Sequence, residues 1–399
     1  MTNSSQPAGQ GQLQVLVIGA GLCGLGAAIS LRLAGHQVTV LETVPVLEEV
    51  GAGLQITPNG TRLLRAWGVD KLLPSGAIAA PVSFAMNRFD GQPLAQRKDY
   101  GTEVEARNGS PLWCLHRADL QRALAERAAA LGAVIRLGCA VSDVNADRGF
   151  VTLAKGEIVH GDLVFAADGL WSTARSALFD AGEEIPRPLP TGDLAYRIIV
   201  DRDQVDDEDI RKRFEKPSIN LWVGPGVHAV AYSVRGGRYL NLVLLVPDDL
   251  PSHIPKAEGD LNEMRALFEG WDPVGDCAHP MLPYMAQGAN SSLEDAATIG
   301  ALLSHVHRKD QLPKALALYD SIRRPRVDQL VRETFLQGIE HHLVDGVEQQ
   351  KRDERLARSM MEEYGPESAT PWTHPKIQPW VYRYDAYAEV EAEVTKNPF

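Results

Sequence analysis

A glycine-rich turn between a strand and a helix is the feature that most constrains this fold. Gly19, Gly21 and Gly24 form the pattern G-x-G-x-x-G at the end of the apolar run LQVLVIG at 13–19. The segment 22–35 is rich in Ala and Leu and closes on a glycine, which predicts a helix. Glycines here let the backbone approach a pyrophosphate, and the N-terminus of a helix favours anions. The turn therefore predicts a dinucleotide-binding site.

The residues after that helix support a parallel strand–helix–strand unit. HQVTVLE at 36–42 predicts the next strand, and Glu42 at its end can accept hydrogen bonds from ribose hydroxyls. One alternative is a glycine-rich turn without a nucleotide. A second is a signal peptide or membrane anchor, because residues 13–31 carry no charge. The glycines in that stretch favour the nucleotide site and no integral membrane span. The motif does not separate NAD from FAD.

The rest of the chain indicates a second, β-rich lobe. The N-terminal part continues with a predicted helix at 116–132, a strand at 133–138, a hairpin at 148–161 and a strand at 162–168. Apolar runs separated by glycine turns between about 194 and 247 predict a mostly antiparallel layer. Further helices are predicted at 259–269, 291–305 and 313–339.

Composition excludes some partners and favours a reducing compartment. The 399 residues carry 40 Lys plus Arg against 52 Asp plus Glu, a formal net charge of −12, which argues against nucleic acid. An anionic small substrate stays open, because one pocket arginine outweighs a diffuse surface charge. The four cysteines form no C-x-x-C pair, which disfavours zinc and redox-pair sites and favours a cytoplasmic location.

Two further motifs follow the first along the chain. Asp168 opens the segment DGLWSTAR at 168–175, directly after the apolar run DLVFA. Gly275 and Asp276 open GDCAHP at 275–280, and the chain continues through Pro283 to Asn290. In this order, the three motifs resemble the single-component flavoprotein aromatic hydroxylases, and in particular the salicylate-hydroxylase-like FAD-dependent monooxygenases. The resemblance covers about 13 to 388 and includes LHRADLQRAL, LWVGPGVHAVAYSVRGGRYLNLV, FEGWDP and IRRPR.

The resemblance implies a set of FAD contacts. Gly19, Gly21, Gly24 and Glu42 would hold the ADP half, and Arg117 would reach the cofactor from the start of its helix. Asp168 would help to anchor FAD, and Asp276 would bond the ribityl chain. The loop from Pro283 to Asn290 would surround the isoalloxazine. The full set of expected cofactor residues is Gly19, Gly21, Gly24, Glu42, Ala52, Gly53, Arg117, Asp168, Asp276, Gly288, Ala289 and Asn290.

The resemblance also implies the chemistry. NADPH or NADH would reduce the flavin, O2 would add to give a C4a-hydroperoxide, and its distal oxygen would attack an electron-rich ring. The expected function is hydroxylation of a small phenolic or aromatic acid substrate, without a metal. A flavin oxidase or halogenase is disfavoured because the W-x-W-x-I-P signature is absent. The oligomeric state is open, with a homodimer as one option.

Candidate substrate residues lie in the β-rich segment. Arg197 can bind a carboxylate or phenolate through charge-assisted hydrogen bonds. Tyr196, His228, Tyr232 and Tyr239 alternate with apolar residues and are further candidates. The alternative is that such positions face solvent or the far side of the sheet. The expected catalytic set is Arg197, Tyr232, Tyr239 and Pro283. The adjacent His341 and His342 lie on a predicted helix, where neighbouring side chains diverge by ~100°, so a metal site there is disfavoured.

The third motif lacks the strand that precedes the other two. Gly270 to Val274 read GWDPV, and Pro273 cannot donate to a sheet ladder. In the resembling family a longer segment ending in a buried strand comes before Gly-Asp. The sequence therefore predicts that a segment is missing before Gly275, which leaves a central sheet position empty or filled by another segment. The alternative function is a non-catalytic flavoprotein remnant, or the product of a truncated gene model, with weak FAD binding.

The expected fold class is α/β: a discontinuous Rossmann-like FAD-binding domain, a β-rich substrate lobe and C-terminal helices. The domain boundaries are a disordered tail at 1–12, the first part of the FAD-binding domain at 13–185, the substrate lobe at 186–270, the second part of the FAD-binding domain at 271–345 and a C-terminal tail at 346–399. Residues 80–105 are expected to join the substrate lobe.

Overall fold

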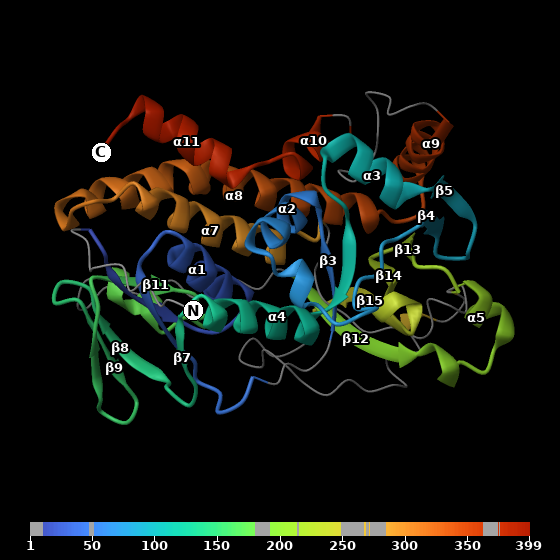
Figure 1. The fold of residues 1–399 in the computed structure, drawn as a ribbon. Helices are drawn as coiled ribbons and strands as arrows, with labels where there is room; N and C mark the ends of the chain where they lie inside the picture. Colours follow the sequence, from blue (N-terminus) through green and yellow to red (C-terminus); the bar gives the residue numbers. More distant parts are fainter. Residues whose placement is uncertain are drawn as a thin grey trace.

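The computed structural model describes most of the chain in two lobes joined by long helices (Figure 1). The described residues are 11–47, 52–179, 192–213, 215–248, 267–268, 271, 285–361, 374 and 376–399. None of the described helices is long and apolar enough to cross a membrane. The predicted helix at 259–269 and the third motif at 275–280 lie outside these residues, apart from Leu267 and Phe268.

The first lobe is built on a four-stranded parallel sheet. Its order is β11 (Leu163–Ala166), β1 (Gln14–Ile18), β2 (Gln37–Leu41) and β7 (Val134–Arg136). The apolar run of β1 is buried because the sheet is covered by α1 (Leu22–Leu33) and α4 (Arg117–Ala130). On the other face lies an antiparallel sheet of β8 (Val141–Asn145), β9 (Phe150–Leu153) and β10 (Ile158–His160).

The four strands are hydrogen-bonded in continuous order, which corrects one expectation. β1 pairs with β11 on one side and with β2 on the other, so no central position of this sheet is empty. A further strand can join only at an edge. Among the described residues β11 pairs with β1 alone, and its residues are half-buried or exposed, whereas four of the five residues of β1 are buried. The next large apolar side chains, Leu170 and Trp171, are 62% and 63% exposed.

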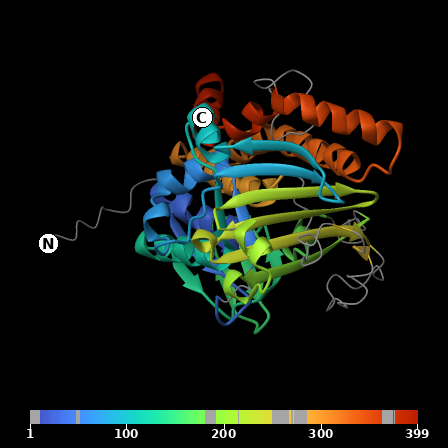
Figure 2. The ribbon, with the colours of Figure 1, turned by 90° about the vertical axis from the view of Figure 1, so that its right-hand side faces the viewer.

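The second lobe is a six-stranded, mostly antiparallel sheet, seen across its strands in Figure 2. Its order is β12 (Asp193–Asp201), β15 (Tyr239–Pro247), β14 (Val227–Val234), β13 (Ser218–Gly224), β4 (Ser83–Arg88) and β5 (Pro93–Lys98). The β4–β13 pair is parallel, and the other pairs are antiparallel. Residues 83–98 thus join this sheet although they come from the N-terminal part of the chain.

Helices connect the lobes and cover the cavity between them. α7 (Gln287–Ser304) packs against α1, and the 30-residue α8 (Leu312–His341) runs beside α7 from the first lobe to the second (Figure 1). The other α-helices in the described residues are α2 (Pro58–Trp67), α3 (Tyr100–Asn108), α5 (Glu208–Arg213), α9 (Val347–Met361), α10 (Ile377–Tyr382) and α11 (Ala386–Lys396). A two-stranded ladder of β3 (Gly53–Ile56) and β6 (Trp113–His116) lies between the two sheets.

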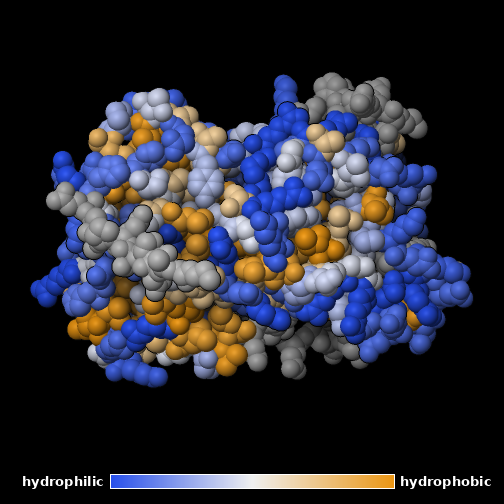
Figure 3. Space-filling model, in the orientation of Figure 1, coloured by the Kyte–Doolittle hydropathy of each residue, from blue (hydrophilic) through white to orange (hydrophobic). Residues whose placement is uncertain are grey.

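The surface is mixed, with one broad apolar area on the face seen in Figure 3. This area lies at the lower left, over the region of β7, β8 and β9 in the orientation of Figure 1. Exposed apolar side chains in and beside these strands are Val134, Leu137 and Ile158. Apolar surface of this kind is typical of a site that another segment or protein covers.

A buried ionic cluster connects α7 with α2, with α8 and, through α8, with the C-terminal segment. The Glu294 carboxylate on α7 accepts hydrogen bonds from Arg323 and Arg326 on α8 and from Asn59 on α2. Arg326 also donates to the carbonyl oxygens of Trp380 and Val381. The side chains of Glu294, Arg323 and Arg326 are 1%, 3% and 5% exposed, so their charges are compensated by protein groups and hardly by solvent.

Candidate active site between the two lobes

The glycine turn leaves open space where an anion would lie. A Cβ on Gly24 would come within 2.0 Å of the Gly19 carbonyl oxygen, and one on Gly19 within 2.5 Å of the Ala167 oxygen. These two glycines are required by close packing of the turn against its neighbours. Gly21 is different, because a Cβ there would meet nothing within 4 Å. Gly21 is the N-cap of α1, so the space faces backbone N–H groups and the positive end of the helix dipole.

The acidic residues predicted in the first two motifs hold loops in place. Glu42 accepts hydrogen bonds from the backbone N–H groups of Ala20, at 2.6 Å, and of Val44, at 3.0 Å. Asp168 accepts from the Ser172 hydroxyl and from the Ala174 N–H. Neither carboxylate lines the cavity described below. Both residues therefore shape the loops that border it.

The start of α7 forms the opposite wall of the same site. A Cβ on Gly288 would meet nothing within 4 Å, and Gly288 and Ala289 line the cavity. Asn290 is fully buried and bridges segments: it accepts from the Thr57 N–H and donates to the carbonyl oxygens of Gln55 and Ala286. Asn290 thus positions the start of α7 against β3. Asp276 and Pro283 lie outside the described residues.

A cavity of about 570 Å³ runs between the two lobes. The first lobe lines it with the glycine turn, with Gly53 and Gln55 of β3, and with Arg117 at the start of α4. The second lobe contributes one face of the six-stranded sheet. The cavity residues on this sheet are Phe84, Arg197, Ile219, Leu221, His228, Val230, Tyr232, Asn241 and Val243. An elongated ligand with a polar end at the turn and an apolar end at the sheet fits this arrangement.

The period-2 alternation of the strands decides which residues face the cavity. On β14, His228, Val230 and Tyr232 line it, whereas Ala229 and Ala231 pack into an apolar cluster on the far face with Phe268 and Trp271. Tyr196 belongs to the far cluster, so its neighbour Arg197 points to the cavity.

Tyr239 is not among the cavity-lining residues of the described chain. It lies at the first position of β15, two residues before Asn241, with the guanidinium carbons of Arg235 and Arg238 at 5.6 and 5.0 Å from its ring centroid. The geometry places it beside the Arg235–Asp119 ion pair. This arrangement gives no support to a catalytic role for Tyr239.

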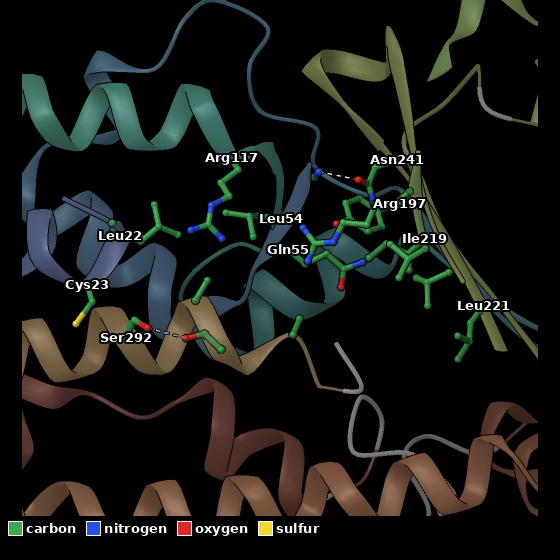
Figure 4. A pocket seen from close by; sticks show the side chains of 18 of the residues that line it. Leu22, Cys23, Leu54, Gln55, Arg117, Arg197, Ile219, Leu221, Asn241 and Ser292 are labelled. Atoms are coloured by element: carbon green, nitrogen blue, oxygen red, sulfur yellow. Dashed lines mark hydrogen bonds between the residues drawn. The ribbon is translucent and has the colours of Figure 1, made fainter. Parts of the chain in front are cut away.

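Arg117 and Arg197 enter the cavity from different elements. In Figure 4, Arg117 extends from α4 above the glycine turn, whereas Arg197 extends from β12 beside Gln55 and Asn241. The Asn241 side chain accepts a hydrogen bond from the Gly53 N–H at 2.6 Å. A Cβ on Gly53 would lie 2.7 Å from Asn241 and from the Tyr232 ring, so this glycine permits β3 to contact the sheet. The absence of a side chain at Gly53 therefore allows the two lobes to make direct contact at this point.

Sequence reasoning missed four polar residues of the cavity, which are Gln55, Asn241, Ser292 and His341. Gln55 and Asn241 carry no motif, and only the pairing of β3 with the neighbouring sheet brings them together. The sequence analysis considers His341 only as half of an adjacent pair for which a metal site is disfavoured, yet it lines the cavity from the end of α8. Cys23 also lines the cavity, but burial raises the pKa of its thiol to about 12, so it stays protonated at neutral pH.

Replacing Gly21 with valine tests the anion site. We expect Gly21→Val to abolish FAD retention, because its branched side chain fills the space that the pyrophosphate needs. The fold should persist, because the added atoms meet no protein atom within 4 Å of the Cβ position. FAD content is measured by absorbance and folding by circular dichroism. Gly24→Ala is the matched contrast and should damage the fold itself, since its Cβ would lie 2.0 Å from a carbonyl oxygen. Unchanged FAD content in Gly21→Val would refute the assignment.

The glycine turn at the N-terminus of α1 and the cavity beside it are typical of a dinucleotide-binding protein. The FAD binding domain family matches residues 12–185 and 273–334. An FAD-dependent monooxygenase of Beauveria bassiana, OpS4, is 44% identical over 425 residues, covering 96% of this chain and 98% of the relative. A 3-hydroxybenzoate 6-hydroxylase of Polaromonas naphthalenivorans is 30% identical over 86% of this chain and 91% of that protein. The chain belongs to the aromatic-hydroxylase family of FAD-dependent monooxygenases.

Solved structures agree on the fold. A salicylate hydroxylase in complex with its substrate superposes with a TM-score of 0.72 at 23% identity, covering 96% of this chain and 98% of that one. The structure of FqzB superposes with a TM-score of 0.77 at 21% identity, covering 98% and 94%. The α/β class and the discontinuous FAD-binding domain are thereby confirmed.

The match to the Beauveria bassiana relative extends over more positions than this chain contains. It covers 425 residues, whereas the whole chain has 399. The relative therefore has residues without a counterpart here. Their place in the chain is not specified by this count, so a missing segment before Gly275 stays a prediction.

Proposed function

We propose that this FAD-dependent monooxygenase hydroxylates a small phenolic ring that bears a carboxylate, with NADPH or NADH as electron donor and O2 as co-substrate. The observation that carries the proposal is Arg197, a cationic side chain in an otherwise largely apolar half of the cavity. The names of two relatives, 3-hydroxybenzoate 6-hydroxylase and 3-amino-4-hydroxybenzoate 2-monooxygenase, support the same substrate class.

The walls of the sheet-side half suit a flat aromatic ring. Phe84, Ile219, Leu221, Val230 and Val243 supply apolar contacts from four neighbouring strands. Burying a ring against them is favourable by ~25 cal/mol per Å² of apolar area and removes water from the reacting atoms. An aromatic substrate would therefore be bound through burial of its apolar surface, and a small number of polar groups would set its orientation.

Two polar groups would orient the substrate. The Arg197 guanidinium would bind the carboxylate through parallel hydrogen bonds. Tyr232 is buried, and burial raises the pKa of its phenol, so its hydroxyl stays protonated and can donate to an oxygen of the substrate. The Arg197 charge lies close enough to oppose part of that shift. Together they would fix the ring in one orientation, which decides the carbon that is hydroxylated.

The first lobe would hold the cofactor. The glycine turn and the start of α1 would receive the pyrophosphate, Arg117 would lie beside it, and Gly288 and Ala289 would face the ring system. When bound, FAD supplies the transfer of electrons from NAD(P)H to O2 and the activation of oxygen. The chain's own contribution is to align the two ligands and to keep the cavity closed to water.

Removing the arginine tests the substrate class. We expect Arg197→Ala to weaken 3-hydroxybenzoate binding by about 10- to 100-fold, since a hydrogen bond to a charged group contributes ~1.5–3 kcal/mol. Phenol, which lacks the carboxylate, should bind parent and variant alike. Arg238→Ala is the matched control, because that arginine is exposed and borders Tyr239 rather than the cavity. Binding is measured by perturbation of the flavin spectrum. An equal loss for both ligands would contradict a specific carboxylate contact.

A further inference from the structure

Gln55 places a buried side-chain amide on the wall of the cavity. The residue lies on β3, is 8% exposed and lines the cavity. In the part of the chain that the structure describes, its amide makes no hydrogen bond, whereas the amide oxygen of the nearby Asn241 accepts from the Gly53 N–H. A buried amide without a partner costs free energy, so such a group is typically satisfied by a ligand or by water. Gln55 is therefore a candidate for contact with a bound ligand.

The geometry of β3 directs this amide toward the six-stranded sheet. A Cβ on Gly53 would lie 2.7 Å from the side chains of Asn241 and Tyr232, so that position faces the sheet. Successive side chains of a strand alternate in direction, and Gln55, two residues further on, therefore points the same way. In Figure 4 it lies beside Arg197. The amide thus belongs to the sheet-side half of the cavity, where the substrate would lie, and not to the half beside the glycine turn.

Hydrogen bonds on both sides fix the backbone that carries Gln55. The residue pairs with Cys114 in the β3–β6 ladder, and its carbonyl oxygen accepts from the Asn290 side chain at 3.2 Å. Two residues earlier, the Gly53 N–H donates to Asn241 at 2.6 Å. A polar group on such a fixed strand keeps its position better than one on a loop, which lets it discriminate between similar ligands. The first lobe therefore presents the Gln55 amide at a defined point of the substrate space.

The chemistry of the amide suits a neutral hydroxyl group. A side-chain amide has an acceptor oxygen and N–H donors, and a hydroxyl group likewise both donates and accepts. The neighbouring Arg197 offers donors only and carries a charge, so a carboxylate binds there in preference to Gln55. Tyr232 approaches the cavity from the six-stranded sheet, whereas Gln55 approaches it from β3. The two side chains would therefore contact different positions of a bound ring.

We propose that Gln55 is a specificity-determining residue that binds a second hydroxyl group on the ring, which makes a dihydroxybenzoate the preferred substrate. Arg197 binds the carboxylate, Tyr232 binds one ring oxygen and Gln55 binds the other. The inference rests on the proposed function, since it needs a phenolic ring that bears a carboxylate. Three contacts around a planar ring prevent its rotation within the cavity and so fix the carbon that reacts. A second oxygen substituent also raises the electron density of the ring, which favours attack by an electrophilic oxygen.

The test compares ligands that differ by one hydroxyl group. The probes are the monohydroxybenzoates and the dihydroxybenzoates, and their binding to FAD-loaded protein is measured by perturbation of the flavin spectrum. We expect at least one dihydroxybenzoate to bind the parent protein about 5- to 50-fold more tightly than either monohydroxybenzoate that it contains, the range expected for a hydrogen bond to a buried amide. Gln55→Met keeps the length of the side chain and removes the amide, so it should abolish this gain.

The controls separate this contact from a structural role and from a role in cofactor binding. Gln55→Met should not weaken the binding of monohydroxybenzoates, and Gln96→Met, at an exposed position of β5, should bind every probe like the parent. An equal loss for both groups of probes in Gln55→Met would overturn the inference, as would a parent that gains nothing from the second hydroxyl. A lower FAD content in Gln55→Met would also overturn it, because the amide would then contact the flavin. Failure of every probe to bind the parent would instead overturn the proposed substrate class, and this inference with it.

Discussion

Inserting a relative's segment between Pro273 and Val274 should raise the FAD content and the melting temperature of this protein together. The chain as it stands should hold FAD weakly and couple little of its NAD(P)H consumption to hydroxylation. The reason is that a strand precedes each of the first two motifs, whereas the residues before the third motif do not predict one. Gly19 follows β1 and Asp168 follows β11, whereas Gly275 follows Asp272, Pro273 and Val274. The match over 425 residues to a relative of this 399-residue chain supports a shortened sequence.

The open side of β11 suggests where the strand would go. The four described strands leave no interior gap, so a fifth must pair at an edge, and β11 has half-buried residues followed by exposed Leu170 and Trp171. A strand there would add ladder hydrogen bonds and cover apolar surface at once. The absence of both could remove much of the ~5–15 kcal/mol by which domains are stable.

The experiment compares two insertions of equal length. One carries the residues of the Beauveria bassiana relative that fall between its counterparts of Pro273 and Val274, and the other is a Gly/Ser linker. FAD is measured by its absorbance per protein, and unfolding by calorimetry. We expect a gain from the first insertion alone. The prediction is wrong if the 399-residue parent already purifies yellow, with one FAD per chain and a cooperative transition.

Neutralising Glu294 should destabilise the protein by about 3–5 kcal/mol, the usual cost of removing one partner from a buried ion pair. Glu294→Gln keeps the size of the side chain and can still bond Asn59, but it leaves Arg323 and Arg326 with less compensating charge. Arg323 retains Asp295, whereas Arg326 retains carbonyl oxygens and the rings of Tyr384 and Trp380. The loss should therefore fall chiefly on the contact of α8 with the C-terminal segment.

Two measurements test the effect of Glu294→Gln. Denaturant unfolding gives the change in free energy, and limited proteolysis should cut the Glu294→Gln variant faster near residues 374–384 than the parent. Glu391→Gln is the matched control, because that carboxylate is 65% exposed and pairs only with a histidine among its described partners. Surface pairs of this kind contribute little, so the control should unfold like the parent. A stability loss of equal size in both variants would contradict the prediction that the buried Glu294 is specifically important for stability.

The first lobe could be predicted from local sequence because its signals are local. The run at 13–19, the helix at 22–35 and the strand at 36–42 correspond to β1, α1 and β2 to within a few residues at each end. A glycine turn constrains its own geometry, since a Cβ on Gly24 would clash with the Gly19 carbonyl oxygen and Gly19 itself has a positive φ of 98°. The hairpin at 148–161 and the long helix near 313–339 follow for the same reason, from turn residues and periodicity.

The cavity could be predicted only in part. Arg197 and Tyr232 were found because alternation along a strand puts every second residue on one face, but alternation does not say which face is inward or where the cavity ends. Tyr239 obeys the same alternation as Asn241 and still lies beyond the cavity, beside two arginines. Gln55, Asn241 and His341 carry no local signal, so their place depends on how β3, the sheet and α8 pack.

The sequence by itself determined the class of fold and the flavoprotein family, and it predicted an anion site at Gly21, because each rests on residues within one short segment or on the order of three such segments. Only the tertiary structure decided which side chains share the cavity and that Gly53 meets Asn241. Those contacts join residues more than a hundred positions apart. Their formation depends on the burial of whole sheet and helix faces, an energy that is summed over the molecule and is not encoded at any single position.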